Sequence, residues 1–210
     1  MPINPSLFPQ LIEAINQSID QHADAVTELD QAIGDGDHVF NLQRGLKALD
    51  QAKQEISQLE WPAAWQKIGM VLMASVGGAS GSLYATLFIS LGKNSAQQPG
   101  ISGFANAFAL AIEAVKQRGK ADVGEKTMLD VLVPVANALK AGADSGAALP
   151  ELLSSITQTA AAGVEATRDM IATKGRASFL GERSQGHIDA GAKTAQLMIA
   201  AIADCLSQAA

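Results

Sequence analysis

The sequence predicts an all-α fold in which eight antiparallel, up-and-down helices form a single-domain bundle or barrel. Apolar residues recur at helical spacing through eight segments, and no segment shows the strict alternation of a β-strand. Aromatic residues make up only 4% of the chain and alanine is abundant, which favours closely packed helices over sheet. No repeat, linker or change of composition divides the chain, so we expect one domain over residues 1–210.

The chain begins with three predicted helices, and an acidic segment at residues 30–41 connects the first to the second. Asn4 and Pro5 are typical of a helix start, and the first helix reaches about Leu29 with apolar positions at Phe8, Leu11, Ile12, Ile15 and Ile19. The second helix ends before a polar connector at residues 57–60, and its apolar positions are Leu42, Leu46 and Leu49. The third helix ends at Gly77-Gly78, and its apolar positions are Trp61, Trp65, Ile68, Leu72 and Val76.

The next three predicted helices are separated by glycine-containing loops. Ser80 or Ser82 is expected to cap the fourth helix, which ends before a loop at residues 94–102 and has apolar positions at Leu83, Leu87 and Phe88. The fifth helix ends at Arg118-Gly119-Lys120, and its apolar positions are Phe104, Phe108, Ile112 and Val115. Thr127 opens the sixth helix, which covers residues 129–139 and is followed by a small-residue loop at 141–148.

The last two predicted helices flank a long irregular segment at residues 174–191. Pro150 begins the seventh helix, which reaches about Thr173 and has apolar positions at Leu153, Ile156, Ala160 and Val164. The eighth helix runs from about Ala192 to Leu206.

Successive connections in an up-and-down bundle with short loops alternate between its two ends. The odd-numbered connections carry the unusual sequences, at residues 30–41, 77–82, 118–127 and 174–191. The even-numbered connections are ordinary polar or alanine- and glycine-rich turns. We therefore expect the four unusual loops to meet at one end of the bundle and to form the functional site there.

The first of these loops crowds three carboxylates, Asp30, Asp35 and Asp37, beside His38. Like charges within about 4 to 6 Å disfavour one another's ionised forms, and a divalent cation such as Mg²⁺ or Ca²⁺ would resolve this conflict. The spacing excludes an EF-hand, and the two loop glycines lack the third glycine and the preceding strand of a dinucleotide fingerprint. The remaining alternative is that Asp35 and Asp37 only shape a turn and cap the next helix.

The second and third loops carry glycine-rich sequences. Residues 77–82 would allow close backbone approach, and a helix N-terminus at Ser80 would offer free N–H groups to a phosphate, although such clusters are also ordinary turns. Gly124-Glu-Lys-Thr127 lacks the upstream glycine and the preceding strand of a P-loop, which excludes that motif.

The fourth loop contributes Arg176 and Arg183, and a guanidinium is the side chain best suited to bidentate contact with phosphate. The alternative for Arg183 is an ion pair with Glu182 or another acid. His187, in the same loop, is expected to be structural.

The composition narrows the class of protein. A net charge of −6 argues against broad binding to nucleic acid or to anionic membrane surfaces. Cys205 is the single cysteine, so the chain has no internal disulfide. The N-terminus lacks the pattern of a signal peptide, and no stretch is long and apolar enough for a membrane span. We expect a cytoplasmic protein.

Together, the four loops resemble those of the nucleotide-binding L subunit of dihydroxyacetone kinase. The matching motifs are GDGDH at 34–38 with Asn41 three residues on, SVGGASG at 75–81, RGKADVGEKTMLDVLVP at 118–134 and KGRASFLGERSQGH at 174–187. They span most of the chain. The resemblance implies a barrel of eight antiparallel helices that holds ADP or ATP at one end through two Mg²⁺ ions.

The resemblance also implies a set of site residues, none of which acts as a covalent catalytic group. The metal ligands would be Asp30, Asp35 and Asp37. The phosphates would be flanked by His38, Val39, Phe40, Asn41, Ala79 and Ser80 and contacted by Arg176. Gly119 and Met128 would line the base and sugar. The nucleotide would be covered by Asp189, Ala190 and Gly191. Two positions depart from the family, which usually has glycine after the histidine, where this chain has Val39-Phe40, and proline in place of Ala190.

The implied reaction is phosphoryl transfer to dihydroxyacetone held on a separate K subunit, with the bound ADP recharged by a phosphohistidine-bearing M subunit of the phosphotransferase system. Three alternatives stay open at this point: an ATP-dependent kinase subunit that uses free ATP, the helical nucleotide domain of fatty acid kinase, and a non-catalytic ADP-binding regulatory module. A phosphocarrier role for His38 is disfavoured, because three carboxylates beside it oppose the approach of a phosphoryl group without metal.

Overall fold

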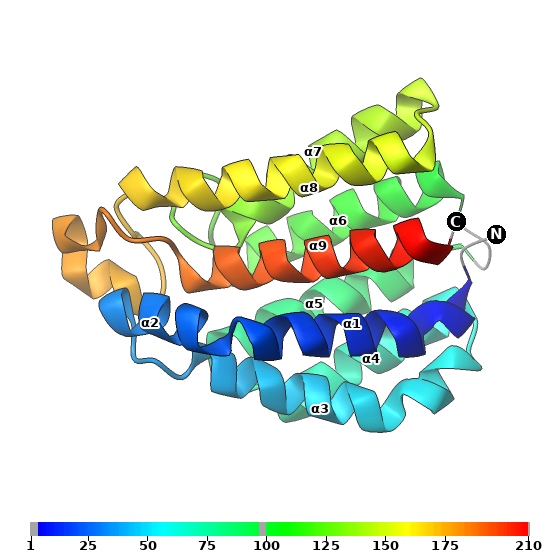
Figure 1. The fold of residues 1–210 in the computed structure, drawn as a ribbon, viewed down its shortest axis with the longest axis horizontal. Helices are drawn as coiled ribbons and strands as arrows, with labels where there is room; N and C mark the ends of the chain where they lie inside the picture. The colour runs from blue at the N-terminus through cyan, green and yellow to red at the C-terminus, as the bar shows by residue number, and fades with distance from the viewer. Residues whose placement is uncertain (1–3, 97–99, 210) are drawn as a thin grey trace.

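The computed structural model describes residues 4–96 and 100–209, and these residues form nine α-helices, three 3-10 helices and no strand (Figure 1). The α-helices are α1 (Phe8–Gln21), α2 (Ala23–Ile33), α3 (His38–Ser57), α4 (Trp61–Ser75), α5 (Gly78–Asn94), α6 (Ile101–Gly119), α7 (Leu129–Ser145), α8 (Leu149–Ala166) and α9 (Ala190–Ala209). The 3-10 helices are η1 (Pro5–Leu7), η2 (Thr167–Asp169) and η3 (Arg176–Ser184). The all-α prediction is confirmed, whereas the predicted count of eight helices is not.

The long helices pack side by side in a closed ring. Helix α1 packs against α3, each of α3 to α8 packs against the next helix in the chain, and α9 packs back against α1. Figure 1 shows these helices running along a common axis, with the start of α1 and the end of α9 at one end and with α2 and η3 at the other. The odd-numbered connections of the predicted bundle therefore lie at the end that carries α2 and η3.

The count differs from the prediction because the first predicted helix breaks at His22. The His22 ring nitrogen Nδ1 bonds the carbonyl of Ser18 at 2.8 Å, the carbonyl that an uninterrupted helix would pair with the His22 backbone N–H. That N–H bonds the carbonyl of Ile19 instead, at 3.3 Å. Helix α2 then continues to Ile33, four residues beyond the predicted end, and reaches the acidic segment.

Three further boundaries differ from the prediction. Neither Ser80 nor Ser82 caps the fourth predicted helix, because α5 already begins at Gly78 and the two hydroxyls donate to backbone carbonyls within its first turns. Helix α7 continues past residue 139 to Ser145, where Gly146 ends it in the left-handed conformation with φ of +69°. Helix α8 ends at Ala166 rather than near Thr173.

The core fills the inside of the ring with side chains from all the long helices. Phe8, Trp61 and Trp65 form an aromatic group within it, with ring centroids 4.9 to 5.4 Å apart. Both tryptophans are 8% exposed, so they are part of the core. Every helix within the described residues falls short of the length or apolar character that a membrane crossing requires.

One close contact between helices positions the start of α7. Gly163 of α8 faces the backbone of α7 so closely that an added β-carbon would lie 2.5 Å from the carbonyl oxygen of Asp130. The same β-carbon would lie 3.1 Å from the α-carbon of Val131. Because the contacting atoms belong to the backbone, a larger side chain at this position would have to push the two helices apart.

We expect Gly163→Ala to lower the free energy of unfolding by about 1–3 kcal/mol, because the overpacking cost exceeds the gain in helix propensity. Urea denaturation followed by circular dichroism measures the change. Ser155→Ala, at an exposed position of the same helix, is the control and should leave the stability nearly unchanged. If Gly163→Ala and the wild type had equal free energies of unfolding, the close contact between α7 and α8 would not contribute to stability.

Candidate metal and phosphate site

Three carboxylates gather where α2 ends and α3 begins. Asp30 lies in the last turn of α2, Asp35 in the connecting turn, and Asp37 immediately before α3. Each offers an oxygen that lies within 4.8 Å of the oxygens offered by the other two. Oxygen donors at this spacing suit hard cations such as Mg²⁺ or Ca²⁺, so the structure brings the predicted metal ligands together.

The backbone around these carboxylates is shaped to keep them close. A carboxylate oxygen of Asp30 accepts a hydrogen bond from the backbone N–H of His38 at 3.1 Å. Gly34 lies so near Asp30 that an added β-carbon would be 2.3 Å from its other carboxylate oxygen. Asp37 occupies the N-cap position of α3 but makes no capping hydrogen bond. Helix capping therefore does not explain why Asp37 is present.

Arg176, the first residue of η3, faces the acidic cluster. Its guanidinium nitrogen Nη2 lies 2.8 Å from a carboxylate oxygen of Asp35. The arginine side chain is 71% exposed, so solvent screens most of the attraction between the two charges. The pair nevertheless places a group suited to bidentate phosphate contact directly beside the predicted metal ligands.

His38 connects the acidic loop to α9. Its ring nitrogen Nε2 lies 2.9 Å from the hydroxyl of Thr194, and this hydroxyl donates to the carbonyl of Gly191 at 3.1 Å. Since the hydroxyl has only one proton, we assign Nε2 of His38 as the donor in the first bond. Burial lowers the pKa of His38, although the nearby charges of Asp30 and Asp37 oppose this shift, so the ring is neutral at pH 7.

The glycine-rich segment before α5 packs against the first turns of α3. A β-carbon added to Gly77 would lie 2.4 Å from the side-chain oxygen of Asn41 and 2.6 Å from the guanidinium of Arg44. Arg44 also donates from Nε to the carbonyl of Ser75 at 2.6 Å, which ties α3 to the end of α4. Gly78 has φ of +67°, and α5 begins without a side-chain cap. The free N–H groups at this helix start can bind an anion.

A buried carboxylate organises the loop between α6 and α7. Asp130 is 2% exposed and accepts hydrogen bonds from the backbone N–H groups of Gly124 at 2.5 Å and Thr127 at 2.7 Å. At the other side of the loop, Gly119 ends α6 against α5, where an added β-carbon would lie 3.3 Å from a leucine side chain. These contacts hold Gly119 and Met128, the two residues predicted to line the base and sugar.

The chain enters α9 beside Met128. Asp189 accepts a hydrogen bond from the backbone N–H of Ala192 at 2.7 Å, and a β-carbon added to Gly191 would lie 3.7 Å from the backbone nitrogen of Met128. Burial raises the pKa of Asp189 to about 7, although the Ala192 N–H and the nearby Lys126 both favour the ionised form. The predicted nucleotide cover therefore contains a carboxyl group that titrates near neutral pH.

The remaining predicted site residues differ in what they present to solvent. Val39 is 3% exposed and packs in the core, so only its backbone can face a ligand, whereas the neighbouring Phe40 is 67% exposed. Ala79 is exposed, Ser80 is half-buried, and Ala190 is buried. The first departure from the family pattern thus places Val39 in the core and Phe40 on the surface, and the second places a buried Ala190 where the family usually has proline.

Two predicted roles in the segment between η2 and α9 can be checked directly. Within the described part of the chain, Arg183 forms no ion pair with Glu182, so that alternative is not supported. His187 contributes its backbone carbonyl, which accepts a hydrogen bond from Lys126, in agreement with a structural role.

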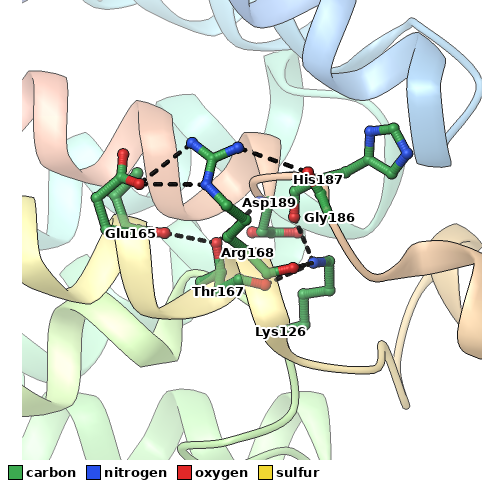
Figure 2. A network of polar contacts seen from close by, with 8 residues as sticks. Lys126, Glu165, Thr167, Arg168, Gly186, His187 and Asp189 are labelled. Carbon is green, nitrogen blue, oxygen red and sulfur yellow. Dashed lines mark hydrogen bonds and ion pairs between the residues drawn. The ribbon is translucent and has the colours of Figure 1, made fainter.

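The sequence analysis missed the buried junction that Figure 2 shows. Lys126, which is 1% exposed, donates from Nζ to the carbonyls of Thr167 at 2.5 Å, Arg168 at 3.5 Å and His187. Beside it, Glu125 accepts a hydrogen bond from the Thr173 hydroxyl at 2.9 Å. In the sequence, Lys126 stands out only as part of a charged pair inside the motif at 118–134, which does not fit a P-loop.

Comparison with known proteins identifies relatives along most of the chain. A DAK2 domain matches residues 32–204. The ADP-binding subunit of PEP-dependent dihydroxyacetone kinase 1 from Listeria innocua is 37% identical over 187 residues, which cover 89% of each chain. The ADP-binding subunit of PEP-dependent dihydroxyacetone kinase from Escherichia coli is 37% identical over 180 residues, which cover 85% of this chain and 86% of that protein.

A solved structure supports the same fold. The dihydroxyacetone kinase from C. freundii, crystallised in complex with AMP-PNP and Mg²⁺, superposes on 97% of this chain with a TM-score of 0.74. The two sequences are 23% identical, so this likeness bears on the fold alone. The chain spans about a third, 34%, of the length of that kinase.

We expect Asp35→Asn and Asp37→Asn each to abolish the Mg²⁺-dependent retention of nucleotide without loss of helix content, because each change removes a metal ligand and also relieves acid crowding. Gel filtration with and without Mg²⁺ measures retention, and circular dichroism measures helicity. Asp24→Asn removes an exposed carboxylate from α2, away from the cluster, and is the matched control. A large loss of helicity in either variant would contradict this assignment.

The raised pKa of Asp189 makes a prediction about stability and pH. The folded-state pKa lies above the unfolded value, so the protonated carboxyl favours the folded state at low pH, and this contribution is lost as pH rises through about 7. The difference in unfolding free energy between the wild type and Asp189→Asn should therefore fall between pH 5 and 8, by at most about 1.4 kcal/mol per pH unit. Urea denaturation of both proteins across this range measures it. A constant difference would mean that Asp189 does not titrate there.

Proposed function

This chain belongs to the DAK2 domain family, and from that premise we propose that it is the nucleotide-binding subunit of a dihydroxyacetone kinase, an enzyme that transfers phosphoryl groups. The relatives named as ADP-binding subunits match it over most of their own length. The observation that carries the proposal is the cluster of Asp30, Asp35 and Asp37, which lies at the same end of the barrel as the uncapped start of α5 and as Arg176.

The acidic cluster fits Mg²⁺ by its chemistry. Its donors are all carboxylate oxygens, and Mg²⁺ in phosphate sites binds one or two carboxylates and completes its octahedron with waters and phosphate oxygens. Asp30, Asp35 and Asp37 would accordingly hold Mg²⁺ beside the phosphates of ADP or ATP, and the resemblance to the L subunit implies two such ions. When bound, these ions supply neutralisation of the charge on the phosphoryl group.

The chain itself would position and neutralise the phosphates. Arg176 would exchange its contact with Asp35 for a contact with phosphate, since the metal then balances the carboxylate. The free N–H groups at the start of α5, with Ala79 and Ser80, and the first turn of α3 from His38 to Asn41 would flank the phosphates. Phosphoryl transfer depends mainly on positioning and electrostatics, so no covalent group from the chain is needed.

The nucleoside would lie between two loops. Gly119 and Met128 would line the base and sugar on one side, and residues 189–191 would cover the nucleotide on the other. The nearness of Gly191 to Met128 supports this arrangement, because it places the two loops beside each other.

We propose two partner subunits. A K subunit would hold dihydroxyacetone, and a phosphohistidine-bearing M subunit of the phosphotransferase system would recharge the bound ADP. The relatives' names support this proposal, since they describe subunits of PEP-dependent enzymes. We infer a cytoplasmic location from the same assignment.

Two alternatives make different predictions. An ATP-dependent kinase subunit would exchange its bound ADP for free ATP, and a non-catalytic module would bind ADP without passing phosphoryl groups to any sugar-binding subunit. The names of the relatives favour a kinase subunit with ADP as a bound coenzyme.

The identity and exchange rate of the bound nucleotide test the proposal. We expect the freshly purified protein to release near-stoichiometric ADP on denaturation, because the metal cluster and the cover over the nucleotide both slow its escape. EDTA should release the nucleotide, since its retention depends on Mg²⁺. Excess ATP should exchange slowly.

The outcomes separate the alternatives. Rapid exchange with ATP would indicate an ATP-dependent kinase subunit. Slow exchange without phosphoryl transfer in the presence of sugar-binding and phosphohistidine subunits would indicate a regulatory module. Failure to bind ADP or ATP in the presence of Mg²⁺ would refute the proposed function.

A further inference from the structure

Lys126 occupies an unusual position between α6 and α7. It is 1% exposed, and its backbone has φ of +61°, a left-handed conformation that side-chain-bearing residues rarely adopt. Within the described residues its ammonium forms no ion pair with a carboxylate. A strained backbone and a buried cation persist only when the surrounding structure depends on them.

The ammonium is satisfied by backbone carbonyls from two distant parts of the chain. Thr167 and Arg168 lie directly after α8, and His187 lies shortly before α9. Figure 2 shows these carbonyls converging on Nζ of Lys126. Lys126 therefore closes the base of the segment 167–189, whose two ends it holds together.

Further bonds, among them two between neutral groups, join the same ends of this segment. The backbone N–H of Gly186 donates to the carbonyl of Arg168 at 2.8 Å, and the backbone N–H of Asp189 donates to the hydroxyl of Thr167 at 3.1 Å. Both are neutral bonds between the two ends. Lys126 adds a charged donor from a third element, the loop between α6 and α7, and so fixes the closed base relative to the rest of the barrel.

The protonated, charged form of Lys126 suits these contacts. Burial lowers the pKa of Lys126, whereas nearby Asp189, Asp169 and Asp130 favour the protonated form. The lysine ammonium carries three donors, and three carbonyls surround it here. A neutral side chain of similar length would leave these carbonyls without their donor.

The two walls of the proposed nucleoside site are both anchored near this ammonium. Met128 lies two residues after Lys126 in the chain, and Asp189 lies two residues after His187. Gly191 then lies near Met128, since a β-carbon added to Gly191 would be 3.7 Å from the backbone nitrogen of Met128. Arg176, at the far end of the segment, is held separately by its ion pair with Asp35. The contacts of Lys126 thus position the residues on the base and sugar side of the proposed site rather than those on the phosphate side.

We propose that Lys126 is a positioning residue that sets the spacing between the two walls of the nucleoside site and so gives the site its preference for a nucleotide over a bare phosphate compound. This inference rests on the proposed function. Lys126 itself touches neither metal nor phosphate in this assignment, since its donors are occupied by backbone carbonyls.

The test compares ADP with inorganic pyrophosphate, each in the presence of Mg²⁺, by titration calorimetry of the nucleotide-free protein. Lys126→Met should weaken the binding of ADP by on the order of tenfold to a hundredfold, because misplaced walls lose the nucleoside contacts. The same substitution should leave pyrophosphate binding within about twofold, because the phosphate side is held independently.

Glu125→Gln is the matched control. Glu125 is the adjacent residue, and its carboxylate, which is 27% exposed, accepts hydrogen bonds from the Asp122 backbone N–H at 2.7 Å and the Thr173 hydroxyl at 2.9 Å and pairs with Lys174 at 3.3 Å. Glutamine keeps a side-chain oxygen that can accept these hydrogen bonds, and none of them involves the carbonyls around Lys126, so the substitution should change neither ADP nor pyrophosphate binding appreciably.

Three results would overturn the inference. Unchanged ADP binding with a lowered melting temperature would make Lys126 purely structural, and an equal loss of ADP and pyrophosphate binding would show a general disturbance of the site. If the wild type bound pyrophosphate and ADP equally, no nucleoside contact would exist to be positioned. Failure of the wild type to bind ADP at all would instead refute the proposed function.

Hydrogen exchange on the wild type provides a second measurement that holds even if Lys126→Met does not fold. Adding ADP and Mg²⁺ should slow the exchange of amides in residues 126–128 and 187–191 together, whereas pyrophosphate and Mg²⁺ should protect only the acidic loop and the start of α5. Equal protection of the junction by both ligands would contradict the assignment.

Discussion

The mutual repulsion of three carboxylates is the constraint on which the functional end of this barrel depends. Asp30, Asp35 and Asp37 offer oxygens within 4.8 Å of one another, and α2 directs the unfavourable negative end of its dipole toward them. The fold keeps this arrangement with local bonds, such as that from the His38 backbone to Asp30. Arg176 balances part of the charge at Asp35, and the proposed divalent ions would balance the rest.

The barrel provides the rigid frame that such a site needs. Its long helices close into a ring, so the loops at one end are held by neighbours on both sides. Specific bonds then tie loop to loop: Arg44 joins α3 to the end of α4, and His38 joins the acidic loop to α9. Each bond links segments far apart in the sequence. The site is therefore a property of the closed ring rather than of any single loop.

The segment between α8 and α9 is a long connection that is ordered by bonds at its ends and at its tip and by a small apolar cluster shared with α2. Its ends are joined through Lys126 and through the bond between Asp189 and Thr167, while its tip carries Arg176 to the acidic cluster. Because the base and the tip are held by different partners, the two sides of the proposed nucleotide site can be separated experimentally. The same division explains how one loop can serve both phosphate and nucleoside.

The sequence by itself determined the helical class, most helix positions and the convergence of four loops, because hydrophobic periodicity and the order of the connections follow directly from the order of the residues. It also predicted that Asp30, Asp35 and Asp37 lie together, which the structure confirms, whereas their role as metal ligands stays a prediction. It did not reveal the break at His22, where a side chain takes the carbonyl that the helix would have used. It also could not reveal Lys126 or Asp130, whose partners are backbone groups. Backbone carbonyls and N–H groups look alike at every position of a sequence, so only the tertiary structure decides which of them a buried charge will meet.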